Sequence, residues 1–504
     1  MSAREKMRGT ARPKVQRADE AISLIRSGST IAIGGAGGVG EPDAIIEALV
    51  SRYRRTGEPG NLTEIHPIRT GEIDGRGTSA LGVPGLVSCM VGGAIWPSGM
   101  TELVERINDG EMEAYNLPIG ILYAMLEATA AGRPGVVSSV GLDTCMDPRF
   151  GGGSLNSCSS RRLVERIEIH GTEYLFYRAL PVDTAIIRAT VADTLGNVST
   201  EEEPSVCGSL LLAQAARASG GRTIVQVKRI VPAGTLDPRK VRIPGILVDA
   251  VVEHSSQWQT TRHAFDPTTV GDARMDMSTL PTVPREKRIV LRRALMEVDE
   301  GESIAIGAGL PGFLPNEAIR TGLFDRVTFT IEHGVIGGLN GYSAGGSTFP
   351  LAHNPEAIID AADQLRTYAG GGVDIAFLGV GEIDSAGNVN VSRLGRRIPG
   401  SGGFIEITQG IRRVVFCTTL EGQGVRKFRQ AVQQVTFSAS RARLLGTHVR
   451  YVTERAVFGL SHRGLVLLEV APGVDPQRDL QRVLDCDFEI SPELQLMPAN
   501  CFEF

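Results

Sequence analysis

A carboxylate placed between a strand and a run of glycines is the residue of this chain best suited to covalent chemistry. Residues 327–332 read V-T-F-T-I-E, the apolar and threonine alternation of a half-buried strand, and Glu332 stands at its end. Gly334, Gly337 and Gly338 follow, and glycines allow a sharp turn and the close approach of a ligand. An ionised carboxylate there can attack a bound carbonyl group. The alternative, a strand-end glutamate in water, describes most glutamates and stays open at this point.

A second candidate is the pair Gly402-Gly403, which precedes F-I-E-I-T, a segment (404–408) with the alternation of a strand. Two bare backbone N–H groups can point at a ligand oxygen, as an oxyanion hole requires. A plain tight turn is the alternative. His333, next to Glu332, would point to the opposite face of a continuing strand and is interpreted as a wall residue rather than a base.

Glycine runs follow several predicted strands. The chain has 61 glycines in 504 residues, about 12% against a usual value of about 7%. Two runs, 35–40 and 307–312, fit G-x-G-x-x-G, the dinucleotide fingerprint. A lone pattern of this kind is weak in a glycine-rich chain, and Pro311 removes an N–H from any phosphate cradle in the second run. The runs therefore predict ligand-cradling turns but do not favour a nicotinamide site.

Other catalytic motifs find little support. Residues 341–345 read G-Y-S-A-G and fit the G-x-S-x-G nucleophile elbow, which needs a strand before it and a helix after it. G-G-L-N precedes the motif and Pro350 follows soon after, so a loop that is mobile or contacts a ligand is favoured over a serine nucleophile. The eight histidines show no H-x-H or H-x-x-x-H pair and the seven cysteines no C-x-x-C pair, so no metal site is predicted.

Composition excludes several functional classes. The net charge is −5 without an obvious basic face, so nucleic acid is not expected as a partner. No apolar run reaches the roughly 18 residues of a membrane span, so we expect no membrane insertion. Scattered cysteines indicate a reducing compartment, and the cytoplasm is expected. The first 17 residues are basic with one serine, which favours a frayed arm over a transit peptide.

The chain repeats itself. Residues 182–199 match residues 373–390, with Asp183 and Asp374, like Asn197 and Asn388, 191 positions apart. Helix, glycine, strand and glycine loop also recur in the same order at the start of each half. Several matches in one order indicate an internal duplication.

Two homologous α/β halves follow from this repeat, with predicted bounds 14–265 and 285–504 and a linker over 266–284 rich in Asp, Pro, Thr and Met. Continuous Val/Ile/Leu strands that alternate with helices predict a mostly parallel sheet in each half, covered on both faces. Ligands of such sheets bind at the carboxyl ends of the strands, so one site between the halves is expected. The best alignment puts His66 near the counterpart of Glu332.

The quoted residues resemble class I coenzyme A transferases. T-I-E-H-G-V-I-G-G, G-G-G-V-D-I-A-F-L-G, S-G-G-F-I-E-I-T-Q and Y-V-T-E-R-A-V-F carry the likeness in the second half, and E-A-Y-N-L-P and E-Y-L-F-Y-R in the first. The likeness runs in order through residues 14–504 and is closest to the acetate/propionate CoA-transferase branch, in which two subunit types are fused.

The resemblance implies a mechanism and a site. Glu332 would attack an acyl-CoA thioester, pass through an anhydride and a glutamyl-CoA thioester, and hand CoA to a second short-chain carboxylic acid. An ordinary glutamate pKa of about 4.3 would keep it ionised. Gly403 would supply the oxyanion N–H. Coenzyme A is then substrate and carrier, no cofactor is implied, and a homodimer or homotetramer is expected. The implied substrate-binding positions are Gly34, Gly35, Gly37, Gly38, Ile119, Gly307, Gly309, Gly379 and Gly402.

The chain departs from the family pattern at Ile119, where related transferases usually have a glutamine that acts as the second oxyanion donor. His333 also stands where the branch usually has proline. Two alternatives stay open: an acyl-CoA hydrolase on the same scaffold, and a weakly active acyl-CoA-binding homologue.

Overall fold

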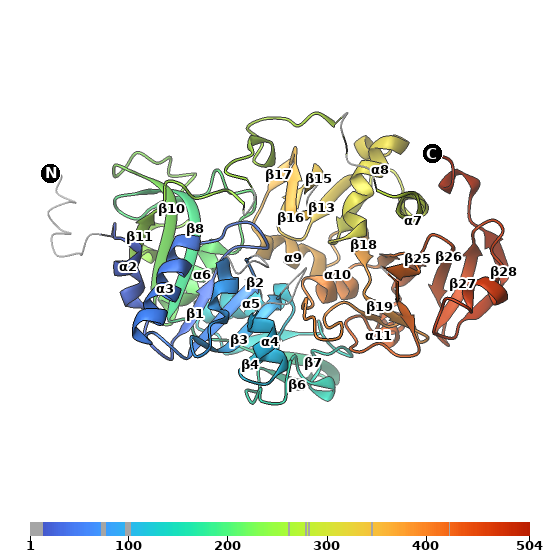
Figure 1. Ribbon diagram of the computed structural model, residues 1–504, viewed down its shortest axis with the longest axis horizontal. Helices are drawn as coiled ribbons and strands as arrows, with labels where there is room; N and C mark the ends of the chain where they lie inside the picture. Colours follow the sequence, from blue (N-terminus) through green and yellow to red (C-terminus); the bar gives the residue numbers. More distant parts are fainter. Residues whose placement is uncertain are drawn as a thin grey trace.

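The structure, a computed structural model, describes residues 14–71, 77–95, 102–260, 263–277, 280, 283–343, 346–422 and 424–504, with the backbone alone for 340–343 and 346–350. Two mostly parallel sheets, one in each half of the chain, dominate these residues (Figure 1). The first half, blue to green, lies beside the second half, yellow to red. The predicted basic arm lies outside the described residues up to position 13.

The first sheet has the strand order β11-β10-β8-β1-β2-β3-β4, with β9 antiparallel beside β8 and all other pairs parallel. Its strands are β1 (Thr30–Ile33), β2 (Leu62–Ile68), β3 (Val87–Ala94), β4 (Glu113–Asn116), β8 (Thr184–Asp193), β9 (Val198–Ser199), β10 (Arg222–Val231) and β11 (Ala250–Glu253). A small antiparallel sheet adds β5 (Gly135–Ser138), β6 (Val164–Ile169) and β7 (Thr172–Arg178). The helices are α2 (Ala18–Ala21), α3 (Asp43–Thr56), α4 (Glu102–Asn108), α5 (Ile119–Ala130) and α6 (Ser209–Ala218).

The second sheet has the order β17-β14-β13-β12-β18-β21-β25-β26-β27-β28, parallel from β13 to β25 and mixed toward its edges. Its strands are β12 (Ser303–Ile306), β13 (Thr328–Ile331), β14 (Val335–Ile336), β17 (Ala357–Ile358), β18 (Ile375–Gly379), β21 (Arg413–Cys417), β25 (His448–Val452), β26 (Ala456–Leu460), β27 (Leu465–Val470) and β28 (Glu489–Leu496). Short strands outside it are β15 (Leu339–Ser343), β16 (Gly346–His353), β19 (Glu382–Asp384), β20 (Val389–Asn390), β22 (Glu421–Gly422), β23 (Val425–Arg426) and β24 (Phe428–Arg429). The helices are α7 (Arg285–Leu295), α8 (Leu314–Thr321), α9 (Ala361–Ala369), α10 (Phe404–Gly410) and α11 (Ala439–Leu445).

The predicted duplication is visible in the sheets. The run β11-β10-β8-β1-β2 has the same order as β25-β21-β18-β12-β13. The repeated turns also share their hydrogen bonds. The backbone N–H of Asn197 donates to Asp193 Oδ1 at 2.9 Å, and that of Asn388 donates to Asp384 Oδ1 at 2.9 Å. The predicted fold class, two similar α/β domains with mostly parallel sheets, is confirmed, and the bounds of the linker stay a prediction.

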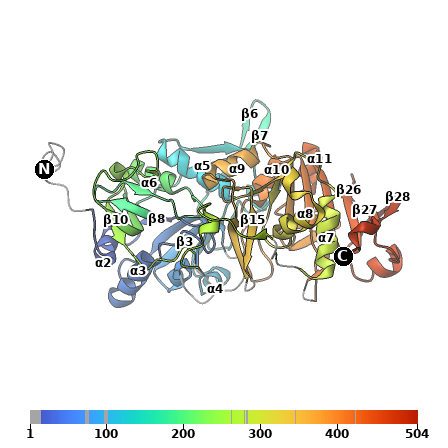
Figure 2. The same ribbon diagram turned by 90° about the horizontal axis from the view of Figure 1, so that it is seen from above.

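Helices cover both faces of each sheet and join the halves on one side. Figure 2 shows α6, α5, α9 and α10 in a row, and neighbours in this row are in contact. Alternate strand residues face different cores: Ala32 and Ala305 belong to one cluster that spans both halves, whereas Ile31 and Ile304 belong to separate outer clusters. The halves therefore share a core beneath this helix row.

Two local predictions concern residues 404–408 and residues 341–345. Residues 404–408, predicted as strand-like, form α10, so this prediction is wrong: contacts with α9 outweigh the modest strand preference of two isoleucines. Gly341 to Ser343 end β15, and β16 follows as a hairpin rather than a helix, which does not fit a nucleophile elbow. The rest of that motif, 344–345, lies outside the described residues. None of the described helices has the length and apolarity needed to cross a membrane.

Candidate active site

Glu332 lies where β13 ends and turns into β14. Ile331 pairs with Val335 across this tight antiparallel turn, and the N–H of Gly334 donates to the carbonyl of Ile331 at 3.1 Å. Gly334 has a φ of 90°, and a Cβ there would lie 2.2 Å from the carbonyl oxygen of Ile359. The turn therefore requires glycine, and it places the Glu332 side chain at the carboxyl end of the parallel strands.

The carboxylate of Glu332 accepts a hydrogen bond from a backbone amide across the site. The N–H of Gly403 donates to Glu332 Oε2 at 3.1 Å, and Gly403 is the N-cap residue of α10. A Cβ on Gly403 would lie 2.2 Å from the same oxygen. The donor is thus available because residue 403 has no side chain.

The loop that carries Gly403 is anchored on the first half. Ala94 forms a β-bridge with Gly400, and the N–H of Gly402 donates to the carbonyl of Gly93 at 3.2 Å. The N–H of Ile119, at the start of α5, donates to the carbonyl of Gly402 at 3.1 Å. The first half therefore fixes the backbone donor that faces the nucleophile candidate.

Burial changes the acidity of Glu332. Its side chain is half-buried, and desolvation raises its pKa to about 7, while the hydrogen bond from Gly403 lowers it. The expectation of an ordinary value near 4.3 was wrong, because the carboxylate lies deep in the cleft between the halves. Strongly shifted carboxyl groups in clefts are typical of functional sites.

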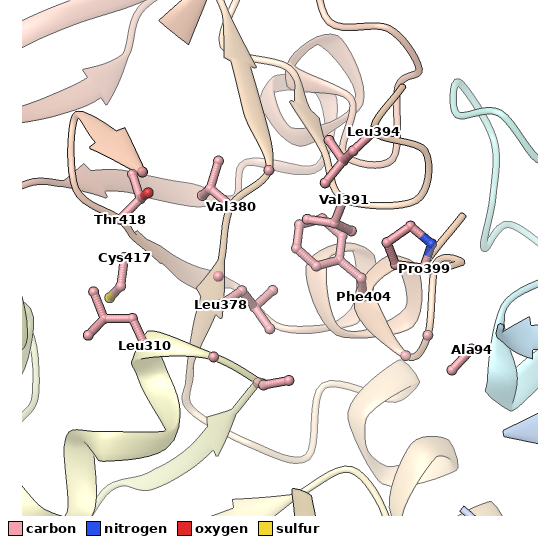
Figure 3. A pocket seen from close by; sticks show the side chains of 18 of the residues that line it. Ala94, Leu310, Leu378, Val380, Val391, Leu394, Pro399, Phe404, Cys417 and Thr418 are labelled. Atoms are coloured by element: carbon pink, nitrogen blue, oxygen red, sulfur yellow. The ribbon is translucent and has the colours of Figure 1, made fainter. Parts of the chain in front are cut away.

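A cavity of about 1200 Å³ opens at Glu332 and is lined by both halves (Figure 3). Of the predicted binding glycines, Gly37, Gly38, Gly307, Gly309, Gly379 and Gly402 line it, together with Glu332 and Gly403. His333 lines it too, and burial lowers the pKa of its ring to about 3, so the ring is neutral at pH 7. The predicted residues from four separate strand ends thus meet at one cavity.

The cavity changes in character along its length. Ala94 and Thr418 lie on opposite sides of it, with apolar side chains such as Leu378, Val391 and Phe404 between them (Figure 3). At the Thr418 side, Lys427 donates to the Thr418 hydroxyl at 2.6 Å, and burial lowers the pKa of its ammonium group. The cavity also contains the cations Lys287 and Arg455 and the carboxylates Glu286, Glu421 and Glu454.

The structure does not bring three predicted positions to this cavity. The N–H of Gly34 continues the strand pairing by donating to Ile186, and a Cβ on Gly35 would meet Thr70 at 2.4 Å. These two glycines line a separate space of about 20 Å³. Ile119 is fully buried and packs against Gly93, where a Cβ would lie 2.6 Å from its Cγ1. The small size of the two glycines and the apolar side chain of Ile119 therefore contribute to packing in this structure.

The first half treats the equivalent strand end differently. Ala32 pairs with Ile65, and its counterpart Ala305 pairs with Thr330. His66 is therefore the counterpart of Ile331, and Pro67 is the counterpart of Glu332. His66 thus lies one residue before the counterpart of the nucleophile candidate. In the adjoining buried cluster, His66 Nδ1 lies 3.1 Å from Glu64 Oε1, and Arg69 Nε lies 3.9 Å from the same oxygen.

Sequence reasoning missed two charged residues beside the site. Arg69 lines the cavity from the end of β2, and Glu406 is buried in the first turn of α10. The only local signal for Glu406 is an acidic residue between Ile405 and Ile407 in an apolar run. Among the described residues, no three His, Cys, Asp or Glu side chains converge as metal ligands would.

Comparison with known proteins identifies the class. A family model described as coenzyme A transferase matches residues 15–254, and relatives along nearly the whole chain carry the same activity in their names. The chain belongs to the coenzyme A transferase family and is an enzyme of this class.

The relatives include the fused branch expected from the sequence. The chain is 37% identical to the caffeate CoA-transferase of Acetobacterium woodii, over 96% of both proteins. It is 38% identical to the acetate CoA-transferase YdiF of Escherichia coli K12, over 97% of this chain and 95% of that one. The crystal structure of the YdiF apoenzyme from E. coli O157:H7 superposes with a TM-score of 0.91 at 36% identity, covering 98% of this chain and 97% of that one.

Proposed function

We propose that this enzyme moves coenzyme A between an acyl-CoA and a free carboxylic acid by a ping-pong reaction on Glu332. The observation that carries the proposal is the 3.1 Å hydrogen bond from Gly403 N–H to Glu332 Oε2 at the cavity wall. It puts a nucleophile and a preorganised donor at one point, where a thioester carbonyl can meet both. A structure of E. coli YdiF described as a thioester complex with CoA, 36% identical to this chain, supports the same chemistry.

The first half-reaction consumes the acyl-CoA. A Glu332 oxygen bonds to the thioester carbonyl carbon, the C–S bond breaks, and an acyl-glutamyl anhydride and CoA thiolate result. The thiolate then attacks the glutamyl carbonyl of the anhydride, the C–O bond breaks, and the donor acid leaves as a carboxylate. Gly403 N–H would stabilise the tetrahedral oxyanion of each attack, an effect of about 3 kcal/mol for one such donor.

The second half-reaction reverses these steps with another acid. Its carboxylate attacks the glutamyl-CoA thioester and releases the thiolate, which then attacks the acyl carbonyl of the new anhydride. The products are a new acyl-CoA and the free Glu332 carboxylate. No proton is gained or lost overall, which suits a site whose neighbouring histidine is neutral.

The Ala94 side, the apolar middle and the Thr418 side of the cavity suit the three parts of an acyl-CoA. The carbonyl would meet Glu332 and Gly403 near Ala94, and the pantetheine arm would lie along the apolar wall that includes Leu378. Lys427, at the Thr418 side, suits the CoA phosphates. Short-chain carboxylic acids remain the proposed acceptors, and a homo-oligomer remains the proposed assembly.

Trapping the intermediate tests the proposal. Incubation with acetyl-CoA followed by sodium borohydride should reduce a glutamyl-CoA thioester, inactivate the enzyme and leave a modified peptide that contains residue 332. Borohydride without acetyl-CoA is the control and should leave activity intact. A modification at another residue, or hydrolysis of acetyl-CoA with no transfer to any carboxylic acid, would contradict the proposal.

A further inference from the structure

A second buried carboxyl group lies close to the nucleophile and has no part in the reaction proposed above. Glu406 is 1% exposed and stands three residues after Gly403, in the first turn of α10. Its Oε1 accepts the N–H of Ile121 at 3.0 Å, and the N–H of Gly120 also points to this carboxyl. Glu406, from the second half, therefore binds the N-terminus of α5, from the first half.

The same junction holds the oxyanion loop. Ile119, the first residue of α5, donates its N–H to the carbonyl of Gly402, so consecutive amides of α5 bind Gly402 and Glu406. Leu365 of α9 packs against both Gly403 and Gly120. Its Cδ2 lies 2.9 Å from where a Cβ on Gly403 would be, and its Cβ lies 3.3 Å from the same position on Gly120. Glu406 thus acts on the site through backbone position and charge.

The surroundings of Glu406 are poorly suited to a negative charge. Its second oxygen, Oε2, is buried and has no hydrogen-bond partner among the described residues. Burial raises the pKa of Glu406 to about 8, the amides of Ile121 and Gly120 lower it, and the Glu332 carboxylate raises it. The free enzyme at neutral pH therefore pairs an uncharged Glu406 with a Glu332 that can ionise.

The other ionisable groups nearby do not neutralise this position. Tyr177 on β7 donates its hydroxyl to the carbonyl of Val140 at 2.7 Å, and Glu406 is among the groups that raise its pKa. The remaining ionisable groups on elements around α10 are Tyr123 and Glu127 on α5, Asp363, Arg366 and Tyr368 on α9, Arg441 and Arg443 on α11, and Asp143, Cys145 and Asp147 after β5. Arg366 is exposed and pairs with Glu127 and Asp363.

We propose that Glu406 is a positioning residue for CoA transfer: as an uncharged acid it holds the oxyanion loop against α5, and when it ionises it slows the reaction. The inference rests on the proposed role of Glu332. An ionised Glu406 places a second negative charge behind Gly403, and this charge opposes the negative charge that develops on the tetrahedral oxyanion. The enzyme should therefore have an alkaline limit set by Glu406 as well as an acidic limit set by Glu332.

The test compares the pH profile of kcat/KM for acetyl-CoA in the wild type, Glu406→Gln and Gln409→Ala. The glutamine oxygen keeps the acceptor for the α5 amides but cannot ionise. Gln409 is a matched control on the same helix, because it accepts from Gly141 N–H at 2.9 Å and donates to the carbonyl of Leu142 at 3.1 Å, also across the halves. It carries no charge.

The expected result is a fall of about fivefold between pH 8 and pH 9 in the wild type and in Gln409→Ala, reduced to less than about twofold in Glu406→Gln. Glu406→Ala, which loses the acceptor too, should be slower than Glu406→Gln at every pH. An unchanged alkaline fall in Glu406→Gln would overturn the proposal.

A second measurement does not depend on activity. The folded protein keeps a proton on Glu406 that the unfolded chain loses near pH 4.5, so Glu406 favours the folded state most below that pH and progressively less up to about pH 8. The Tm of Glu406→Gln relative to the wild type should therefore rise by at least about 2 °C between pH 5 and pH 9. A difference in Tm that stays constant between pH 5 and pH 9 would contradict the proposal that Glu406 is uncharged in the folded protein. A wild type that transfers no CoA at any pH would instead overturn the proposed function, and this role with it.

Discussion

β2 and β13 occupy equivalent places in the two sheets, but the pKa values of Glu64, within β2, and Glu332, just after β13, are shifted in opposite directions. Within β2, Glu64 lies 3.1 Å from the ring of His66 and 3.9 Å from Arg69. Burial would raise the pKa of Glu64, but His66 and Arg69 lower it below its ordinary value. At the end of β13, Glu332 has one backbone donor, and burial raises its pKa to about 7.

In this duplicated scaffold, one carboxyl group is suited to stabilising the fold and the other is suited to a reaction. A carboxylate compensated by a histidine and an arginine is held in its charged form and is a poor nucleophile for a substrate. A carboxylate that burial destabilises is more basic, and it has the cavity on one side. The proposed nucleophile lies in the second half, while the first half anchors the loop that faces it.

Removal of the nucleophile should have the largest effect. Glu332→Ala should lower the rate of CoA exchange between acetyl-CoA and labelled acetate by at least about 1000-fold, because it removes the carboxylate proposed to form the anhydride. The matched control is Glu356→Ala, which removes an exposed glutamate beside the same hairpin and should keep normal exchange. Exchange above a few per cent of the wild-type rate in Glu332→Ala would place the nucleophile elsewhere.

Breaking the buried cluster of Glu64, His66 and Arg69 should mainly affect folding. Glu64→Ala leaves the Arg69 cation buried beside His66 without its carboxylate, which typically costs about 3–5 kcal/mol. Urea denaturation measures this loss, and borohydride trapping on the folded fraction should still label residue 332. Loss of trapping without loss of stability would mean that Glu64 takes part in the reaction.

Gly403→Ala should weaken the site without unfolding it. The φ of Gly403 is −86°, so alanine fits the backbone, but its Cβ would lie 2.2 Å from Glu332 Oε2 and displace the carboxylate. We expect kcat/KM to fall about 100-fold, the usual size for one oxyanion donor. Gly370→Ala, with a φ of −81° and the nearest atom at 3.4 Å from the new Cβ, is the control. Equal losses in both variants would count against the role of Gly403.

The smallest of these effects near neutral pH should be the change of kcat/KM with pH. Ionisation of Glu332 is required for attack, so kcat/KM should fall about tenfold per pH unit below about pH 7. The raised pKa also means that folding loses stability as the pH rises from about 4.5 to 7. Glu332→Gln should therefore become more stable than the wild type over that window, by at most about 3 kcal/mol. Glu64→Gln should lose most stability at neutral pH and less in acid, the opposite sign.

Much of the fold can be predicted from sequence because its signals are local or repeated. The match between residues 182–199 and 373–390 predicts the duplication, and alternation in 327–331 predicts β13. The segment 404–408 was misjudged, because the packing of α10 against α9 is a tertiary fact that short apolar alternation does not contain. The N–H of Gly403 nevertheless points into the site from the helix start, where it donates to Glu332 Oε2, and its role as an oxyanion donor stays a prediction.

Some site residues have a local signal in the sequence, and others depend on packing between distant segments. Glu332 and Gly403 stand at a strand end and a glycine pair, which are readable signals. The raised pKa of Glu332 and the part of Glu406 depend on which distant segments bury them. Gly34 and Gly35 resemble their neighbours Gly37 and Gly38 in sequence, and only the turn of the loop decides which pair faces the cavity.

The backbone bridges between residues 93–95 and 399–402 have a consequence for chain connectivity. They join the halves by the same amide-to-carbonyl bonds that hold a sheet together, and one apolar core continues beneath both. The segment 266–284 adds bonds of its own, since the N–H of Asn354 donates to the carbonyl of Thr268 and the N–H of Met275 donates to Asn354 Oδ1. We expect a backbone cut in 266–284 to leave two fragments that stay docked in register, with the proposed nucleophile on one polypeptide and the platform for its partner amide on the other.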